Sequence, residues 1–262
     1  MKFCSLSSGS SGNCQYIQTE KTKLLVDAGF SGKRIQELLK SINVCPSEIN
    51  GILVTHEHID HIKGVGIMSR RFDIPIFANE KTWEEMDEKI GNIDEKNIKI
   101  IDNNEYFNYR DIDIKAINIF HDAIDPVGYI LNYDNKKVSI VTDTGMIDDD
   151  LVGKIKDSDL YFLESNHDEF MLEMGLYPRH LKDRVASRHG HLSNRDAART
   201  LTKLLKGNRE NVILAHLSKD NNVPELAFDT VSNTLVEKGM NVKEEVNLGL
   251  SHRNKPTDFY IL

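Results

Sequence analysis

The sequence predicts an α/β fold in which two β-sheets pack together and helices cover their outer faces. Short apolar runs of the strand type alternate with amphipathic stretches of the helix type along the 262 residues, and this order suits two packed sheets with outer helices. Ligand-type side chains recur from position 56 to position 216, so distant parts of the chain must meet at one site. We therefore expect residues 1–262 to form a single domain. The hydrophobic fraction of 39% and the charged fraction of 28% suit a soluble globule.

The first half of the chain alternates strand-like and helix-like segments. Strands are expected at Lys2–Leu6, Cys14–Gln18, Lys23–Val26, Gly51–Val54 and Ile74–Ala78. Helices are expected at Ser31–Lys40, Val65–Arg71 and Lys81–Lys89. In the first of these helices, Ile35, Leu38 and Leu39 fall on one face, as in an amphipathic helix that packs on a sheet.

The second half begins with strands and continues with helices. Strands cluster between Ile98 and Val141, and helices dominate from Asp149 onward, interrupted by strands near Leu160–Leu163 and Val212–Leu214. The segment Asn194–Leu205 predicts an amphipathic helix with Asn194 as its N-cap. A last helix is expected to start after Pro224 and to end near Gly239.

Residues 56–61 read His-Glu-His-Ile-Asp-His and directly follow the apolar run Gly51–Thr55. Such a run predicts a buried strand, so the polar residues would lie in the loop at its end, where a rigid sheet can aim them. His56 and His58 point the same way if the strand geometry persists, and Asp60 and His61 can then turn to a second ion. Four ligand-type residues so close together favour a two-metal hydrolytic centre over a solvated polar turn.

The motif His-x-His-x-Asp-His resembles the signature of the metallo-β-lactamase superfamily, whose pattern continues with a His, an Asp and a last His, each after a strand. Strand-like runs precede all three in this chain: His121 follows Ile112–Phe120, Asp143 follows Val138–Val141, and His216 follows Val212–Ala215. The resemblance covers most of the chain. It implies the αββα sandwich, two mixed β-sheets flanked by helices, with metals at one edge between the sheets.

The resemblance also implies how the residues divide between two divalent metal ions. One ion would be held by His56, His58 and His121, the second by Asp60, His61 and His216, and Asp143 would bridge both. Asp27, in Val26-Asp27-Ala28-Gly29, is similar to an early family motif whose carboxylate orients ligands without binding metal.

Further segments narrow the resemblance to one branch of the superfamily. They are Ser5–Asn13, His121–Tyr129, Glu164–Asp168 and Gly190–Asn194. Together they resemble the YycJ/WalJ branch, bacterial proteins linked to 5′-to-3′ DNA exonuclease activity. The resemblance implies a phosphodiesterase whose substrate is double-stranded DNA. A hydrolase of small esters, thioesters or lactams on the same metal centre is the alternative, because a superfamily hosts several activities.

The expected chemistry follows from the ligand set. Imidazoles suit Zn²⁺ and Fe²⁺, and carboxylates also admit Mn²⁺, so Zn²⁺ or Mn²⁺ is expected, with Fe²⁺ as a third option. Two such ions can share a water and lower its pKa toward neutrality. We expect the resulting bridging hydroxide to be the nucleophile, with Asp60 both binding metal and orienting it.

A leaving group also needs a proton. Glu164 ends the apolar run Leu160–Leu163, and His191 lies just before a predicted helix. This pair is similar to the Glu and His that assist phosphodiester cleavage in tRNase Z. We expect His191 to donate the proton and Glu164 to hold its tautomer and raise its pKa. The alternative is that Glu164 caps a helix and His191 is structural. His167 either lines the site or is structural.

Two segments have both a binding and a structural interpretation. The Ser/Gly-rich loop Ser7–Asn13 either approaches the metal site and holds an anion, or is a flexible hairpin turn. The segment Arg179–Arg209 has nine basic and two acidic residues, a charge of +7 in a chain whose net charge is −8. Either a polyanion such as DNA meets this segment first, or acidic neighbours balance a solvated helical face.

The remaining expectations concern the compartment. The chain has no run of about 18 apolar residues, so no membrane span is expected. The start Met1-Lys2-Phe3-Cys4 lacks a long apolar signal segment, which favours a cytoplasmic protein. An odd number of cysteines without metal-type spacing argues against disulfides, and Cys4 and Cys14 are expected to be buried on the first two strands.

Overall fold

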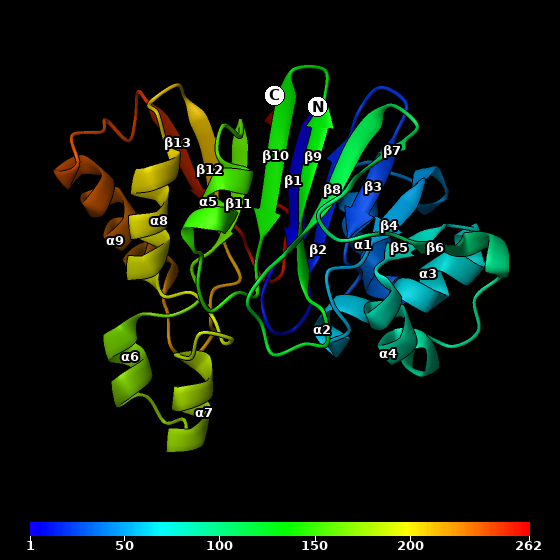
Figure 1. The fold of residues 1–262 in the computed structure, drawn as a ribbon, viewed down its shortest axis with the longest axis horizontal. Helices are drawn as coiled ribbons and strands as arrows, with labels where there is room; N and C mark the ends of the chain where they lie inside the picture. The colour runs from blue at the N-terminus through cyan, green and yellow to red at the C-terminus, as the bar shows by residue number, and fades with distance from the viewer.

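In the computed structural model, which describes residues 1–262, two seven-stranded β-sheets pack face to face and helices cover both outer sides (Figure 1). In each sheet some strands pair parallel and others antiparallel. This arrangement confirms the predicted αββα sandwich. No helix combines the length and the apolar character needed to cross a bilayer.

The first sheet has the strand order β14-β1-β2-β3-β4-β5-β6. Its strands are β1 (Lys2–Ser7), β2 (Cys14–Gln18), β3 (Lys23–Val26), β4 (Gly51–Leu53), β5 (Ile76–Ala78), β6 (Ile98–Ile100) and β14 (Tyr260–Ile261). The second sheet has the order β13-β12-β11-β10-β9-β8-β7. Its strands are β7 (Tyr106–Tyr109), β8 (Ile112–Asn118), β9 (Val127–Tyr133), β10 (Lys136–Val141), β11 (Leu160–Glu164), β12 (Glu210–Ala215) and β13 (Val246–Leu250).

The helices divide between the two sides of the sandwich. They are α1 (Gly32–Ser41), α2 (Ile59–Ile62), α3 (Val65–Phe72), α4 (Glu80–Ile90), α5 (Asp149–Ile155), α6 (Glu169–Met174), α7 (Arg179–Val185), α8 (Asn194–Leu204) and α9 (Pro224–Glu237), with 3-10 turns η1 (Pro46–Glu48) and η2 (Glu95–Asn97). Helices α1, α3 and α4 share an apolar core with the first sheet, and α5, α8 and α9 share one with the second. Helices α6 and α7 extend below the second group (Figure 1).

Central strands such as β3, β11 and β12 are buried on both faces because each sheet is covered on both faces. On β12, Val212 and Leu214 pack toward the helices, whereas Ile213 and Ala215 pack in the core between the sheets. On β3, Leu24 and Val26 face the same central core, and Leu25 faces the helices. Continuous apolar runs in the sequence therefore mark buried strands rather than buried helices.

Three sequence expectations need correction. The N-cap of α8 is Ser193, whose side chain accepts a hydrogen bond from the Asp196 amide, whereas the Asn194 side chain is buried and bonds to Ser165 and Asn222. The region after Asp149 contains two further strands, β13 and β14. Asp60 and His61 lie in the one-turn helix α2 and not in a loop.

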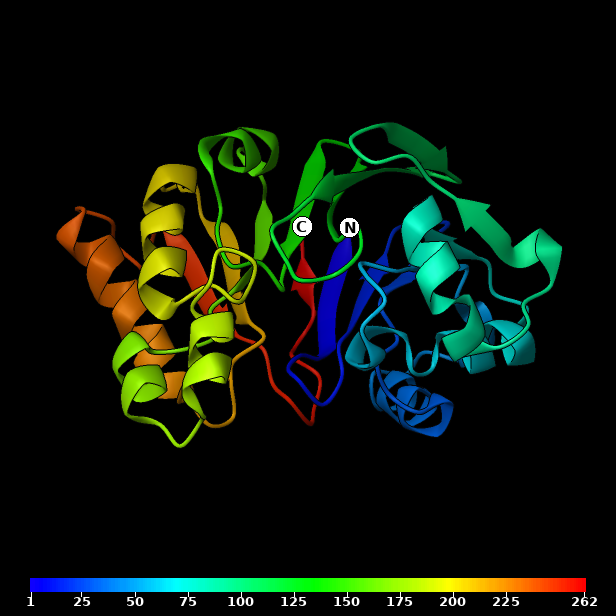
Figure 2. The same cartoon turned by 60° about the horizontal axis from the view of Figure 1, so that its bottom comes forward.

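The C-terminal strand β14 could not be predicted from the sequence pattern. It has two residues, too few to show a periodic pattern, and it exists because it pairs with β1 at the other end of the chain. Figure 2 shows this red strand beside the blue strand β1. Cys4 and Cys14 are buried on β1 and β2 as expected, Cys45 is exposed, and all three are free thiols.

Candidate metal centre

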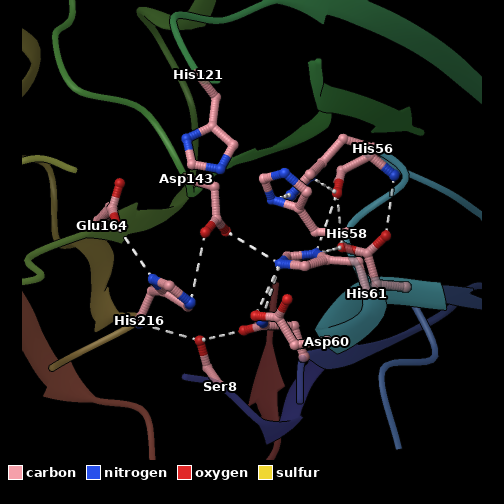
Figure 3. Close-up of polar contacts among 12 residues, drawn as sticks. Ser8, His56, His58, Asp60, His61, His121, Asp143, Glu164 and His216 are labelled. Atoms are coloured by element: carbon pink, nitrogen blue, oxygen red, sulfur yellow. Dashed lines mark hydrogen bonds and ion pairs between the residues drawn. The ribbon is translucent and has the colours of Figure 1, made fainter. Parts of the chain in front are cut away.

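All seven predicted ligand residues meet at one edge of the sandwich (Figure 3). Ligand atoms of His56, His58 and His121 lie within 4.8 Å of one another, and those of Asp60, His61 and His216 form a second such group. Asp143 contacts both groups: it forms a further cluster with His56 of the first group and His61 of the second, and its Oδ1 is 3.4 Å from His216 Nε2.

The ends of strands bring these side chains together. Strands β8, β10, β11 and β12 run in one direction, so His121, Asp143, Glu164 and His216 are all delivered to the same edge of the second sheet. Binding sites of open α/β sheets lie beyond the carboxyl ends of strands for the same geometric reason.

Three of the side chains leave their strands through a left-handed backbone conformation. The φ angles are 60° at Asp27, 56° at Asp143 and 53° at His216. Residues other than glycine seldom adopt positive φ, although Asp and His tolerate it better than most. Such conformations cost free energy, so at these three positions the surrounding structure must hold the backbone in the conformation that directs the side chains to the site.

The six-residue motif is held by the loops around it. The Ala28 amide donates to the His61 carbonyl and the Asn13 amide donates to the Asp60 carbonyl, so the exposed carbonyls of α2 are satisfied by neighbouring segments. Gly29 is required here, because a Cβ at this position would lie 1.6 Å from the Asp60 carbonyl oxygen. The turn after β3 therefore fixes where Asp60 and His61 lie.

Hydrogen bonds to Nδ1 orient three of the candidate ligand histidines, His61, His121 and His216. His61 Nδ1 lies 2.7 Å from Asp27 Oδ2, and Thr55 donates its hydroxyl to the same carboxylate. His121 Nδ1 lies 3.1 Å from the Gly190 carbonyl oxygen, and His216 Nδ1 lies 3.1 Å from Glu164 Oε1. Ligand histidines in metalloproteins are held in this way by carboxylates or carbonyls.

The buried site sets different charge states for its ionisable side chains. Burial, with His61 nearby, holds the pKa of His56 well below its usual range, which keeps the imidazole neutral. Burial acts the same way on His61, but Asp27 and Asp143 outweigh it and raise the pKa of His61 to about 10. Burial would raise the pKa of Asp143, but His216 and His61 hold it well below its usual range.

The donor set fits metal ions. Asp143 Oδ2 and His216 Nε2 are buried without a hydrogen-bond partner, although a buried polar atom left unpaired is destabilising. His56 Nε2 and His58 Nδ1 approach to 3.1 Å, two imidazole nitrogens that a shared cation would satisfy. The His and Asp clusters at this edge are therefore suitable for metal binding.

A carboxylate connects this centre to His191. Glu164 is fully buried, and its Oε1 lies 2.7 Å from His191 Nδ1 and 3.1 Å from His216 Nδ1. Its Oε2 accepts from the Thr144 amide at 2.7 Å. Burial would lower the pKa of His191, but Glu164 outweighs it and raises the pKa to about 9. The predicted pair is thus in contact, and His191 lines the same pocket of about 230 Å³ as Asp60 and Asp143.

Comparisons with known proteins agree with this geometry. Residues 22–217 match the model of the β-lactamase superfamily domain. The chain is 42% identical over 257 residues to exodeoxyribonuclease YycJ of Bacillus anthracis, covering 98% of this chain and 97% of that protein. It is also 42% identical to exodeoxyribonuclease WalJ of Streptococcus pneumoniae, covering 92% and 90%. The chain belongs to the metallo-β-lactamase superfamily.

The fold of this superfamily member is also similar to that of Zn²⁺-bound PqqB from Methylobacterium extorquens. The TM-score is 0.73 at 14% identity, over 98% of this chain and 100% of the other. At that identity the likeness concerns the fold alone. The family resemblance read from the sequence, including its YycJ/WalJ branch, is confirmed by the full-length matches.

Some residues at the metallo-β-lactamase site were not singled out from the sequence. Thr55, directly before the motif, contacts Asp27, His56 and His61 through its hydroxyl. Asn166 donates its amide to the His216 carbonyl. Asn166 lies in the segment Glu164–Asp168, which contributed to the branch resemblance, so that resemblance could have pointed to Asn166 as a site residue.

The Ser7–Asn13 loop approaches the candidate metal centre, as the first of its two interpretations expected. The Ser8 hydroxyl accepts from the His216 amide at 3.0 Å, and Asn13 Nδ2 lies 3.0 Å from His61 Nε2. Ser10 lines the pocket. His167, in contrast, is buried beside β11 and does not line the pocket, and burial lowers its pKa to about 4. The structural interpretation of His167 is therefore favoured.

The basic segment Arg179–Arg209 is largely neutralised, which corrects the idea of an open cationic surface. Six of its nine basic side chains form ion pairs, and five of these pair with carboxylates outside the segment. Arg184, for example, pairs with Asp122 at 2.5 Å. The sequence could not reveal these partners because they are distant along the chain. The alternative, a helical face balanced by acidic neighbours, is the better description of these six residues.

Proposed function

We propose that this protein is a dinuclear metal-dependent phosphodiesterase that degrades double-stranded DNA from the 5′ end. The observation that carries the proposal is 42% identity, over nearly the whole chain, to two exodeoxyribonucleases. The cluster of His and Asp side chains beside the Glu164–His191 pair supports a hydrolytic mechanism. A hydrolase of small esters, thioesters or lactams would not need the Glu164–His191 pair, because no phosphodiester leaving group has to be protonated.

In this proposal the ligands divide as the family pattern implies. One ion would be held by His56, His58 and His121, the second by Asp60, His61 and His216, and Asp143 would contribute to both. Imidazole with carboxylate favours Zn²⁺ or Mn²⁺, with Fe²⁺ as a third option. When bound, such ions supply Lewis acidity that activates water and neutralises charge on phosphoryl oxygens.

His191 is proposed to donate the proton to the leaving oxygen. Its Nδ1 lies 2.7 Å from Glu164, so Nε2 is the nitrogen left to act on the substrate. Glu164 fixes this tautomer and stabilises the protonated ring, which the raised pKa of about 9 for His191 reflects. Glu164 is itself fully buried, so it acts through His191 and does not reach the substrate.

Asp60 is proposed to bind metal and to orient the attacking water. Its carboxylate lines the pocket and lies 3.7 Å from His61 Nε2, at the junction of the ligand cluster and the space that a substrate would enter. The Asp60 side chain is 23% exposed, so it could accept a hydrogen bond from a water molecule as well as hold metal.

The test is digestion of duplex DNA carrying a 5′ label or a 3′ label, with Mn²⁺ or Zn²⁺, beside an Asp60→Ala control. We expect early release of the 5′ label as mononucleotide by the wild type and none by the control. Hydrolysis of bis(p-nitrophenyl) phosphate but not of nitrocefin or a thioester separates a phosphodiesterase from the small-molecule alternative. Failure of the metal-loaded wild type to cleave either labelled strand would overturn the exonuclease proposal.

A further inference from the structure

One buried side chain in the pocket has no hydrogen-bond partner. Asn221 is 1% exposed, lines the same pocket as Asp60 and His191, and neither its Nδ2 nor its Oδ1 is hydrogen-bonded. Leaving both ends of a buried amide unpaired is destabilising, and such groups are rare in folded proteins. The adjacent Asn222 is the contrast: its amide donates to the carbonyls of Ser165 and Asn166.

The backbone around Asn221 holds its side chain in place. The Asn221 amide donates to the Ser218 hydroxyl, and its carbonyl accepts from the Asp168 amide. Gly175 allows the connection between α6 and α7 to approach, because a Cβ there would lie 2.6 Å from Asn221 Oδ1. The unpaired amide is thus fixed by the fold and does not result from a loose loop.

The other residues on the Asn221 side of the pocket suit the binding of a nucleobase. Tyr177 offers an aromatic ring, anchored by its hydroxyl, which donates to Asp220 at 3.0 Å. Leu181 and Val185, both on α7, add apolar surface. Sites that bind single nucleotides combine stacking on an aromatic ring with hydrogen bonds to the base edge.

The hydrogen-bonding groups of the Asn221 amide fit a nucleobase better than a phosphate. An amide offers a donor and an acceptor side by side, which matches the edge of a nucleobase. A phosphate has only acceptors and would leave Oδ1 facing negative charge. The pocket of about 230 Å³ is smaller than the roughly 300–1,000 Å³ of typical sites for drug-sized ligands, so it admits one base and not a base pair.

We propose that Asn221, with Tyr177 and Leu181, forms a nucleobase subsite beside the candidate metal centre, and that Asn221 reads the edge of the inserted base. The inference rests on the proposed function and specifies its substrate: the nucleotide at the reacting end leaves its base pair and enters the pocket as a single strand. Asn221 is a substrate-binding residue in this scheme and takes no part in bond cleavage.

The experiment compares wild type, Asn221→Ala and Asn222→Ala on single-stranded oligonucleotides that differ only in the terminal base, with an abasic terminus as a fifth substrate. A bidentate base contact changes discrimination by about 1–3 kcal/mol, so the wild type should differ among bases by about 5–150-fold in kcat/KM. Asn221→Ala should abolish that difference, mainly by raising KM. The abasic terminus and bis(p-nitrophenyl) phosphate carry no base, so they measure any loss of rate in Asn221→Ala that does not arise from the base contact.

The two asparagines give opposite results if the proposal is right. Asn221→Ala loses base discrimination but keeps the wild-type melting temperature, whereas Asn222→Ala lowers the melting temperature but keeps the discrimination. Asn221→Asp, which preserves the side-chain shape and removes the donor, should change which base is preferred. Equal use of all four bases by wild type, or unchanged base ratios in Asn221→Ala, would overturn the proposal.

A measurement of nucleotide binding can fail independently of the proposed function, so it tests this proposal separately. The four nucleoside monophosphates are titrated by calorimetry into metal-loaded wild type and Asn221→Ala, with no turnover required. Unequal affinities that become equal in the variant support the subsite even if no DNA is cleaved. Equal affinities in the wild type overturn it even if DNA is cleaved.

Discussion

The two halves of the sandwich contribute to the site in different ways. The first sheet supplies four ligand-type side chains from six consecutive residues, His56 to His61, and supports them with the buried carboxylate of Asp27. The second sheet supplies His121, Asp143 and His216 from separate strand ends and supports them with the buried carboxylate of Glu164. Each half therefore has its own set of candidate ligands and its own buried acid that contacts one of them.

The two orienting acids differ in what they contact. Asp27 holds one ligand histidine, His61, together with Thr55. Glu164 shares one oxygen between His216, a candidate ligand, and His191, to which the proposed function assigns proton transfer. Under the proposed function, the first half binds metal and orients the attacking water, whereas the second half couples metal binding to proton transfer. Variants of the two halves should therefore have different effects.

The largest expected effect is loss of turnover in His191→Ala. Removing a general acid typically lowers the rate by about 10²–10⁴-fold, and kcat on DNA should fall by that factor. Metal content, measured by mass spectrometry after dialysis, should stay at the wild-type level because His191 holds no ion in the proposed scheme.

The matched control for this prediction is His189→Ala, an exposed histidine two residues away in the sequence. This variant should retain wild-type turnover. If His191→Ala kept full activity, or if it lost metal together with activity, the division between the two halves would be wrong.

A smaller effect is expected for Asp27→Asn. Replacing an acid that orients a ligand histidine typically weakens metal affinity by about 10–100-fold. Activity at limiting metal should fall accordingly and recover when metal is added in excess, as a metal titration of the rate would show. Glu164→Gln is the comparison: its activity should remain low at saturating metal, because the His191 tautomer is no longer fixed. Equal recovery of both variants would remove the contrast between the two acids.

The two halves of the sandwich also differ in how much of the site could be predicted from the sequence. The six-residue motif is local, so its residue types and spacing identify the ligands directly, and the strands on either side are long enough to show their apolar pattern. His121, Asp143 and His216 are single residues after ordinary strands, and they acquired meaning from the family pattern. The sandwich itself follows from the order of strands and helices.

What the sequence could not provide depends on contacts between distant segments. Strand β14 exists through pairing with β1, and the partners of the basic residues on α7 and α8 lie on other elements. The unpaired amide of Asn221 is another example, because only the packed structure distinguishes it from the hydrogen-bonded Asn222 beside it. Ser193 took the N-cap position because the Asn194 side chain is engaged in the core.

The smallest expected effect concerns a contact that joins the two sheets through their turns. Asp111, between β7 and β8 of the second sheet, accepts hydrogen bonds from Thr19, Thr22 and the Lys21 amide in the turn between β2 and β3. Asp111→Asn should lower the free energy of unfolding by about 1–2 kcal/mol, because hydrogen bonds to a charged acceptor are lost. Urea unfolding at pH 7 measures the difference, with the exposed Asp113→Asn as control.

The pH dependence of the difference in unfolding free energy between wild type and Asp111→Asn shows whether the ionised carboxylate causes it. Burial would raise the pKa of Asp111, but the hydroxyls of Thr22 and Thr19 outweigh it and lower the pKa below its usual value. A carboxyl whose pKa is lower in the folded state stabilises fully above its unfolded pKa of about 3.9, and the stabilisation is lost as pH falls through the folded pKa. The gap between wild type and Asp111→Asn should therefore be constant from pH 7 to about pH 5 and narrow below about pH 4. A gap that widened toward acid pH would mean that the carboxylate is not what joins the two turns.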